Sequence, residues 1–325
     1  MTYNNTKARV LSPDGETELF DIVAGVLQGD TLAPYLFVIV LDYALRAAID
    51  GKEEQLGFKL MKRQSRRIGP IVMTDLDFAD DIALLSEEID QAQELLQRVE
   101  QSVGKVGLKM NAAKTKVMSF NINHPTNLHT EDGILIDEVN NFKYLGSWMG
   151  STEKDIKTRK AAAWRACNSL NSIWNSKLSR AFKLRVFSAT VESVLTYGCE
   201  AWTVTPKIAK TLDGCYTRML RKVLNVSWKQ HITNKELYGE LPKLTHKIRR
   251  RRKRFAGHCL RSKDEPISKL VLWTPRHGTR RRGRPPITYI DTLCMDTGFE
   301  PSELRLAMQD RTTWRTVVTR SNAPP

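Results

Sequence analysis

The sequence predicts an α+β fold, and three observations lead to this prediction. Short β-prone runs alternate with turn signals in residues 1–150, which is typical of a small antiparallel sheet packed on helices. From residue 151 onward, apolar residues recur at helical spacing. The charge changes at the same point, because residues 1–150 carry 15 basic and 22 acidic side chains whereas residues 151–325 carry 36 and 14. We therefore expect an acidic α+β part followed by basic helices, unless the charge gradient has no functional meaning.

The first elements are expected to be a hairpin and a long helix. Residues 7–11 and 18–23 are β-prone and flank a turn signal at 12–15, so they predict a hairpin. Residues 31–49 are strongly apolar and have Pro34 where a first helical turn tolerates it. This composition predicts a buried helix.

A second hairpin is predicted within residues 71–85, where two β-prone runs flank Asp80 and Asp81. The helical spacing of apolar residues returns in residues 87–104. A further short strand is expected at 116–120, and a pair of strands near 134–136 and 142–145.

The basic part of the chain is expected to be helical. Thr152 and Asp155 have the spacing of a capping box, which predicts the start of a helix at this point. Two more helices are expected at about 181–197 and 207–224, and the periodicity is weaker after residue 228. Together these patterns predict three parts, with the bounds 1–150, 151–228 and 229–325.

The composition argues against several classes of protein. The chain has no run of eighteen apolar residues, and its polar start lacks the apolar core of a signal peptide, so we expect neither membrane contact nor secretion. Its five cysteines are odd in number, widely spaced and never arranged as CxxC. This usage favours reduced intracellular thiols over a structural zinc site.

Asp80 and Asp81 are the first candidates for chemistry. Nucleotidyl transfer uses two divalent cations about 3.5–4 Å apart, which clamp the attacking and the leaving oxygen. Aspartate oxygens suit Mg²⁺, and a tight hairpin would present both carboxylates at an exposed tip. Taken alone, the pair is also compatible with an ordinary solvated β-turn.

Four motifs occur in the order that reverse transcriptases have. They are GVLQGDTLAPYLF (25–37), DFADDIALLS (77–86), GLKMNAAKTKVM (107–118) and FKYLGSWM (142–149). On these motifs the chain resembles the reverse transcriptases of non-LTR retrotransposons (LINE elements), and its FADD form is similar to the RTE-like members. The C-terminal region of such elements is similar to RFAGHCLR (254–261), GRPP (283–286) and DRTTWR (310–315).

The resemblance implies an architecture and a function. Residues 1–150 would form an incomplete palm, residues 151–228 a helical thumb, and residues 229–325 a basic, mainly helical extension that binds nucleic acid. The implied activity is that of an RNA-directed DNA polymerase, which uses an RNA template, a DNA primer or target, deoxynucleotides and Mg²⁺. The resemblance implies no particular protein partner.

The resemblance also assigns roles to residues by position. Asp80 and Asp81 would bind the metal, and the Lys114 cation would steady or protonate the departing pyrophosphate. Gln28 and Lys114 could instead be solvated side chains. The template and the incoming nucleotide would lie against Gly25, Gln28 and Gly29.

The primer end would rest on the fourth motif. Tyr144 and Leu145 could equally be core residues. The residues implied for this primer grip are Phe142, Tyr144, Leu145 and Gly146.

The chain departs from the family pattern at its start. Family members carry another catalytic aspartate on a strand upstream of the Gln-Gly motif, and the fingers precede that strand. The hairpin predicted at 7–23 corresponds to the segment after it, so we expect an N-terminal truncation. Without this ligand two cations lack charge compensation, so we expect weakened Mg²⁺ binding and no polymerase activity of the chain alone. The alternatives are a non-catalytic remnant that binds RNA or DNA, and a pseudogene-like product.

Two arginine-rich clusters predict contact with phosphate: KIRRRRKR (247–254) and RRRGR (280–284). The first is also compatible with a nuclear-import signal, and the second contains the core of an AT-hook. We expect a nuclear or cytoplasmic location. The residues expected to bind nucleic acid are Arg249, Arg250, Arg251, Arg252, Lys253, Arg254, Arg280, Arg281, Arg282 and Arg284.

Overall fold

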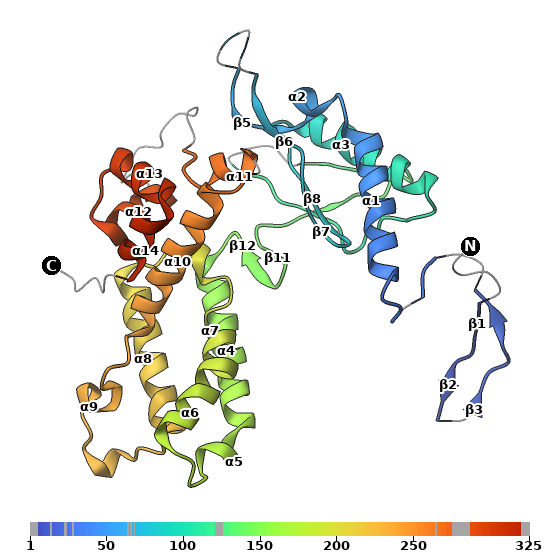
Figure 1. Ribbon diagram of the computed structural model, residues 1–325. Helices are drawn as coiled ribbons and strands as arrows, with labels where there is room; N and C mark the ends of the chain where they lie inside the picture. The colour runs from blue at the N-terminus through green and yellow to red at the C-terminus, as the bar shows by residue number, and fades with distance from the viewer. Residues whose placement is uncertain are drawn as a thin grey trace. The chain divides into compact units, whose positions relative to one another are not determined.

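The computed structural model divides the chain into two compact units, Met1–Val139 and Asn140–Pro325 (Figure 1). Each unit has hydrophobic cores of its own. The fold is a mixture of helices and small β-ladders, as the α+β prediction requires. The structure describes residues 6–13, 15–22, 25–27, 29–63, 65, 67, 69–120, 126–263, 265–274 and 287–319.

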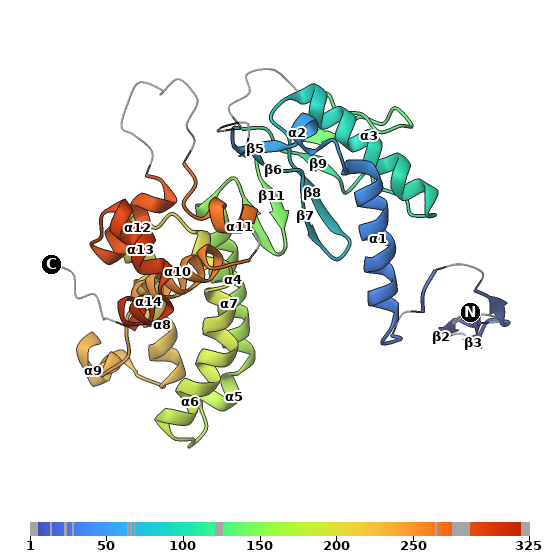
Figure 2. The same ribbon diagram turned by 45° about the horizontal axis from the view of Figure 1, so that its top comes forward.

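Two long helices form the centre of the first unit. Helix α1 (Ala33–Ile49) and helix α3 (Ile89–Lys105) lie side by side, and the short helix α2 (Glu53–Leu56) joins the same core (Figure 2). Leu45 of α1 and Leu95 of α3 are both buried there. The predicted helices at 31–49 and 87–104 are therefore confirmed.

The strands of the first unit pair only in twos among the described residues, so the expected continuous sheet is replaced by separate ladders. The predicted first hairpin is confirmed. The antiparallel pairs are β1 (Lys7–Ala8) with β4 (Phe20–Asp21), β2 (Leu11–Ser12) with β3 (Gly15–Glu16), β5 (Phe58–Met61) with β6 (Ile71–Met73), and β7 (Asp75–Phe78) with β8 (Asp81–Leu84).

Two strand predictions need correction. Residues 134–136 were expected to form a strand paired with 142–145. The observed strand is β10 (Asp137–Glu138), and it runs parallel to β9 (Lys116–Val117). Strand β11 (Phe142–Tyr144) instead forms a hairpin with β12 (Ser147–Met149) in the second unit. Such short runs match several partners, and the tight turn at Leu145-Gly146 selects the nearest one.

Helix α1 was expected to be buried, and this is wrong for one of its sides. Tyr35, Ile39 and Tyr43 follow one another at a spacing of four residues and are 70%, 64% and 68% exposed. Leu41 and Leu45, on the other side, are buried against α3. A helix that is apolar on all sides is expected to be buried on all sides. Among the described residues, neighbours cover only the side of α1 that packs against α3.

The second unit begins with a bundle of helices around one large core. Trp174, Phe187 and Tyr216 are almost completely buried in it. The expected helix at 181–197 is helical from 180 to 195 but contains a π-helical turn, and the one at 207–224 is confirmed. The elements are α4 (Thr152–Ser169), α5 (Asn171–Trp174), α6 (Arg180–Phe187), the π-turn η1 (Ser188–Glu192), α7 (Ser193–Leu195), η2 (Cys199–Ala201), α8 (Pro206–Val223), η3 (Trp228–Gln230) and α9 (Asn234–Tyr238).

Helix α10 (Leu244–Leu260) connects this large core to a second one. Leu244 and Ile248 belong to the first core and Ala256 belongs to the second. The structure therefore has no division at residue 228, because α10 is shared by both cores. The second core is completed by α11 (Glu265–Leu270), α12 (Tyr289–Thr297), α13 (Pro301–Gln309) and α14 (Arg311–Thr319).

The cap of α4 differs from the prediction. Ser151, not Thr152, caps the helix, because its side chain accepts a hydrogen bond from the Lys154 backbone N–H. Asp155 is only 2% exposed and points into the protein. Sequence spacing cannot separate these two assignments, since Ser151 and Thr152 are both good N-caps.

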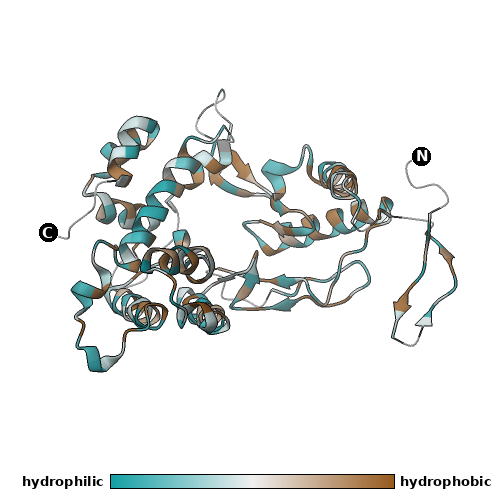
Figure 3. Ribbon diagram, turned by 60° about the horizontal axis from the view of Figure 1, so that its bottom comes forward, coloured by the Kyte–Doolittle hydropathy of each residue, from teal (hydrophilic) through white to brown (hydrophobic). Residues whose placement is uncertain are grey.

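The helices of both units carry hydrophobic and hydrophilic stretches side by side along their length (Figure 3). Within the described residues, no helix has the length and apolar character needed to cross a lipid bilayer.

Candidate functional site

Asp80 and Asp81 lie at the tip of the β7–β8 hairpin, as predicted (Figure 1). Phe78 pairs with Asp81, so only Ala79 and Asp80 form the turn. Ala79 has a φ of 55°, the left-handed conformation that two-residue hairpin turns require and that alanine rarely adopts. Asp80 and Asp81 are both exposed. The flanking ladder thus holds two neighbouring carboxylates in a fixed, solvent-facing position.

The donor chemistry of this tip suits one hydrated Mg²⁺. Magnesium keeps several waters and is usually held by one or two carboxylates together with substrate phosphates. A second cation would need more oxygen donors, and the described part of the chain contains no group of three His, Cys, Asp or Glu residues that could hold a metal. The described residues therefore fit part of a two-metal site.

A second acidic group lies on the other face of the same hairpin. Asp75 and Asp77 alternate along β7, so they share the face of their cross-strand partners Leu84 and Ile82, which pack against the core of α1 and α3. Partial desolvation, together with the neighbouring carboxylates of Asp75 and Asp42, raises the pKa of Asp77 to about 6. Sequence reasoning missed this group, although the Asp-Leu-Asp alternation was a visible signal.

The glycines of the first motif have a conformational role. Gly25 has a φ of 89° and Gly29 a φ of 96°, which other residues rarely adopt. No described atom lies within 4 Å of where a side chain would begin at either position, so the backbone conformation alone accounts for glycine. Gln28 lies outside the described residues.

Lys114 belongs to the same unit as the β7–β8 hairpin. It lies in a turn, where its backbone N–H donates to the backbone and side-chain oxygens of Asn111 at 3.1 and 3.2 Å. Its side chain is exposed. The catalytic candidates Asp80, Asp81 and Lys114 therefore all come from the first unit.

The primer-grip candidates belong to the second unit, in the β11–β12 hairpin. Leu145 and Gly146 form its turn, with φ values of 46° and 81°. The Tyr197 hydroxyl donates to the Leu145 carbonyl at 2.8 Å, and Arg159 donates to the Gly146 carbonyl while its guanidinium lies 4.3 Å from the centre of the Tyr197 ring. Phe142 and Tyr144 are half-buried in the adjoining strand.

Asp155 fixes this hairpin to the helical bundle. Its carboxylate accepts hydrogen bonds from the Trp148 backbone N–H at 3.2 Å and from the Trp202 indole N–H at 2.8 Å. Arg159 lies 3.7 Å from the same carboxylate. Sequence reasoning assigned Asp155 to the helix cap and missed this role. Its two hydrogen-bond donors, the Trp148 backbone N–H and the Trp202 indole N–H, come from other segments of the chain.

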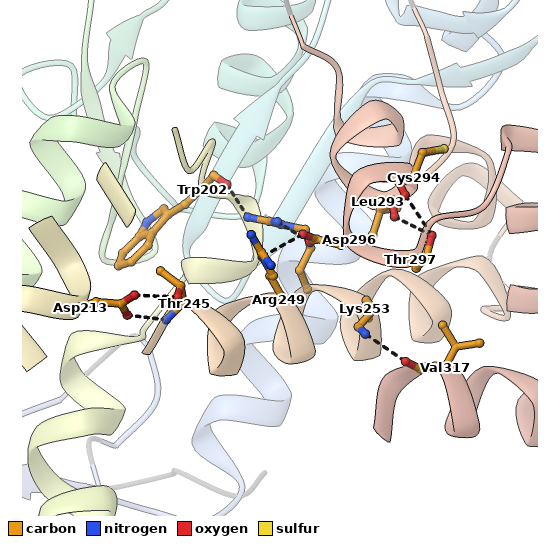
Figure 4. A network of polar contacts seen from close by, with 11 residues as sticks. Trp202, Asp213, Thr245, Arg249, Lys253, Leu293, Cys294, Asp296, Thr297 and Val317 are labelled. Atoms are coloured by element: carbon orange, nitrogen blue, oxygen red, sulfur yellow. Dashed lines mark hydrogen bonds and ion pairs between the residues drawn. The ribbon is translucent and has the colours of Figure 1, made fainter. Parts of the chain in front are cut away.

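The predicted arginine cluster lies on α10, and two of its members are buried. Arg252 is 2% exposed; its guanidinium donates to Asp296 at 2.6 Å and to the Trp202 carbonyl at 2.8 Å. Lys253 is 2% exposed, and its ammonium donates to the Val317 carbonyl at 2.9 Å (Figure 4). The prediction that these two residues contact nucleic acid is wrong, because helical geometry turns them into the second unit.

The remaining members of the cluster divide into two kinds. Arg249 forms an ion pair with Asp296 at 3.3 Å (Figure 4). Arg251 forms one with Glu200 at 2.8 Å. Arg250 and Arg254 are exposed, and no ion pair of either is recorded among the described residues. The second predicted cluster lies outside the described residues: Arg280, Arg281, Arg282 and Arg284.

Comparisons with known proteins agree with the geometry of the first unit. Residues 3–149 match the family described as reverse transcriptase (RNA-dependent DNA polymerase). A transposon-derived protein of Caenorhabditis elegans is 28% identical over 235 residues, which are 68% of this chain and 84% of that protein.

Polyproteins of the retrotransposable element R2 are also similar. The one from Nasonia vitripennis is 28% identical over 155 residues, 44% of this chain, and the one from Drosophila melanogaster is 35% identical over 105 residues, 32% of this chain. The chain spans only 14% and 9% of the length of these two polyproteins.

Residues 3–149 therefore form a reverse transcriptase domain. The chain is similar to the transposon-derived protein and to the R2 polyproteins, and this similarity supports a non-LTR retrotransposon origin of the domain.

Proposed function

We propose that Asp80 and Asp81 bind Mg²⁺ for templated nucleotidyl transfer. The observation that supports this most directly is the two-residue turn of the β7–β8 hairpin, which exposes both carboxylates within a reverse transcriptase domain. When bound, Mg²⁺ polarises a phosphoryl oxygen and neutralises the charge that develops on the leaving phosphates. The two carboxylates hold and orient that cation, and the hairpin keeps their separation constant.

The other site residues would act around this tip. In this proposal Lys114 steadies the leaving pyrophosphate, and Gly25, Gln28 and Gly29 form the surface for template and nucleotide. The Leu145-Gly146 turn, clamped by Tyr197 and Arg159, supports the primer end, with Phe142 and Tyr144 behind it.

The partners in this proposal are an RNA template, a DNA primer or target, and deoxynucleotides. Two parts act on them: residues 1–150 as palm, and the helices from α4 onward as thumb and basic extension. The location would be nuclear or cytoplasmic.

We further propose that the 325-residue polypeptide does not polymerise DNA by itself. Two-metal catalysis needs oxygen donors for both cations, and the two exposed aspartates would supply donors for one hydrated ion. A polymerase-competent assembly would need an additional carboxylate from another segment of polypeptide.

The test combines metal binding with primer extension. Mn²⁺ binding, measured by paramagnetic relaxation of water, should be at least about tenfold weaker in Asp80→Asn/Asp81→Asn, because both donors lose their charge. The matched control is Glu131→Gln/Asp132→Asn, which removes two adjacent exposed carboxylates from a different turn and should bind Mn²⁺ as the parent does. Equal affinity in all three proteins would refute the metal site.

Primer extension tests the second proposal independently. The isolated chain, given an RNA template, an annealed DNA primer, deoxynucleotides and Mg²⁺ or Mn²⁺, should give no product. Templated synthesis that disappears in Asp80→Asn/Asp81→Asn would refute the inactivity of the chain while supporting its metal site.

A second candidate function is nucleic-acid binding without catalysis. It is favoured by the excess of 36 basic over 14 acidic residues in 151–325 and by the exposed cations of α10. The measurement is the salt dependence of RNA and DNA affinity. Removal of residues 241–325 is unsuitable as its test, because α10 belongs to the large core of the second unit and its loss would unfold what remains. Single side chains of α10 are the better probes.

A further inference from the structure

A groove of about 440 Å³ lies along α10. One side is α10 itself, and the other includes Glu192 of η1, Pro242, and Val318 and Thr319 at the end of α14. Six of its lining residues are lysine or arginine and one is histidine, whereas Glu192 is its single acidic residue. A groove with this imbalance attracts anions.

Most of the cations around the groove already have a partner. The Lys247 ammonium lies 2.6 Å from the Glu192 carboxylate, and Arg251 pairs with Glu200 at 2.8 Å. Arg249 pairs with Asp296, and Lys253 is buried with its ammonium on the Val317 carbonyl. The charged groups of these four side chains are therefore already engaged in contacts within the second unit.

Arg250 and Arg254 are different. They are one helical turn apart on the same face of α10, both line the groove and both are exposed. No ion pair or hydrogen bond of either side chain is recorded among the described residues. Two guanidinium groups side by side repel each other unless an anion lies between them.

The charge state of Lys253 reflects the same excess of cations. Desolvation lowers its pKa, Asp296 opposes this effect, and the neighbouring Arg249 and Arg250 lower the pKa further. Desolvation is the largest of these causes, and the two arginines add repulsion of the buried ammonium.

We propose that this groove binds a phosphodiester of a nucleic-acid backbone between Arg250 and Arg254. The proposal rests on the nucleic-acid binding proposed above and names the side chains that carry it. Guanidinium groups bind phosphate oxygens through paired N–H donors, which a fixed pair on one helix face can do without reorganisation. Because the contact is to the backbone, it carries no base preference.

The variant that tests this is Arg250→Ala/Arg254→Ala in the full chain. Its matched control is Arg185→Ala/Arg305→Ala, which removes two exposed arginines of the same unit that do not line the groove. Fluorescence anisotropy with a labelled single-stranded RNA of about 20 nucleotides, and with a DNA duplex of equal length, gives the affinity at each salt concentration. Thermal unfolding of each protein checks that the fold is retained.

We expect the groove variant to bind both probes at least about tenfold more weakly at low salt. The slope of log affinity against log salt should become shallower by about 1 to 2, since each lost phosphate contact contributes about 0.7 to 0.9. Arg250→Lys/Arg254→Lys should keep most of the slope, because it keeps the charge, while losing affinity with the paired N–H donors. The control should keep both affinity and slope.

Three results would overturn the inference. One is an unchanged slope in the groove variant, and another is an equal loss in the control. The third is displacement of the RNA by poly-glutamate as efficiently, per charge, as by unlabelled RNA, which would identify an acidic peptide as the occupant. If the parent chain bound neither probe, the proposed binding function would fail as well, so the two failures are distinguishable.

Discussion

Asp77 is a carboxyl group whose surroundings favour its protonated form. It shares one face of β7 with Asp75, and the Asp42 carboxylate of α1 also acts on it. Since desolvation and two like charges raise its pKa to about 6 from the ordinary 3.8, ionising Asp77 costs more in the folded protein than in the unfolded chain.

The resulting pH dependence can be tested with Asp77→Asn. Well below its unfolded pKa of 3.8, Asp77 is protonated in both states and its ionisation does not affect stability, whereas well above its folded pKa of about 6 it is ionised in both and destabilises the folded state. The parent should therefore lose stability, relative to the variant, as the pH rises from 4 to 6. Urea unfolding of both proteins at pH 4 and pH 7 measures this, and a stability difference that is the same at both values would contradict it.

Arg252 is buried and Arg250 is exposed, so substitutions of the two should differ in their effect on stability. Arg252→Ala removes the guanidinium that lies 2.6 Å from the buried Asp296 carboxylate, so we expect a loss of about 3 kcal/mol of unfolding free energy. Arg250→Ala removes an exposed side chain and should change stability by less than about 0.5 kcal/mol. Denaturant unfolding measures both, and similar losses in the two variants would show that Arg252 is not a structural residue.

At the scale of elements, the packing of α10 on α14 depends on one glycine. A side-chain carbon at Gly257 would collide with the indole ring of Trp314, whose N–H donates to the Lys253 carbonyl at 2.9 Å. Gly214 lies within α8 and has open space around it.

Alanine at these two positions should therefore act in opposite directions. We expect Gly257→Ala to destabilise the chain by about 1–3 kcal/mol, because a close-packed contact cannot accept another carbon. Gly214→Ala should stabilise it by up to about 1 kcal/mol, since alanine favours the helix. Thermal unfolding of both variants gives the signs, and stabilisation by Gly257→Ala would contradict the contact.

The sequence was a good guide to elements that depend on neighbouring residues. The β7–β8 hairpin and helices α3 and α8 follow from turn chemistry and apolar spacing within a dozen residues. The parallel pairing of β9 with β10 and the π-turn after Phe187 depend on contacts between distant segments, and no local pattern indicates them.

The same limit applies to the candidate site. The positions of Asp80 and Asp81 could be predicted because a hairpin tip is defined locally. The role of Asp155 could not, because it depends on Trp148 and Trp202. The run at 247–254 could not be sorted into buried and exposed members either, because the partners of Arg252 and Lys253 come from Trp202, α12 and α14.

At the scale of the whole molecule, the proposed metal site and the proposed nucleic-acid-binding groove belong to different units. The candidate carboxylates belong to Met1–Val139, whose sequence is acidic, whereas the basic groove belongs to Asn140–Pro325. The primer-grip candidates lie at the start of the second unit. Contacts of Asp155, Arg159 and Tyr197 hold their hairpin, β11–β12, to the helices of that unit. On these proposals, substitutions at the hairpin tip of the first unit should change metal affinity alone, and substitutions in the groove of the second unit should change nucleic-acid affinity alone.

The rotational setting of α10 has one more consequence. Each residue turns a helix by about 100°, so inserting one amino acid ahead of Arg249 would carry each following side chain to the place of its neighbour. Arg251, which now meets solvent, would take the buried place of Arg252, and the buried Lys253 would be carried to the exposed place of Arg254, although the composition of the run would hardly change. The position of each basic residue around the helix axis, rather than the number of arginines, therefore decides whether its side chain faces solvent or packs inside the protein.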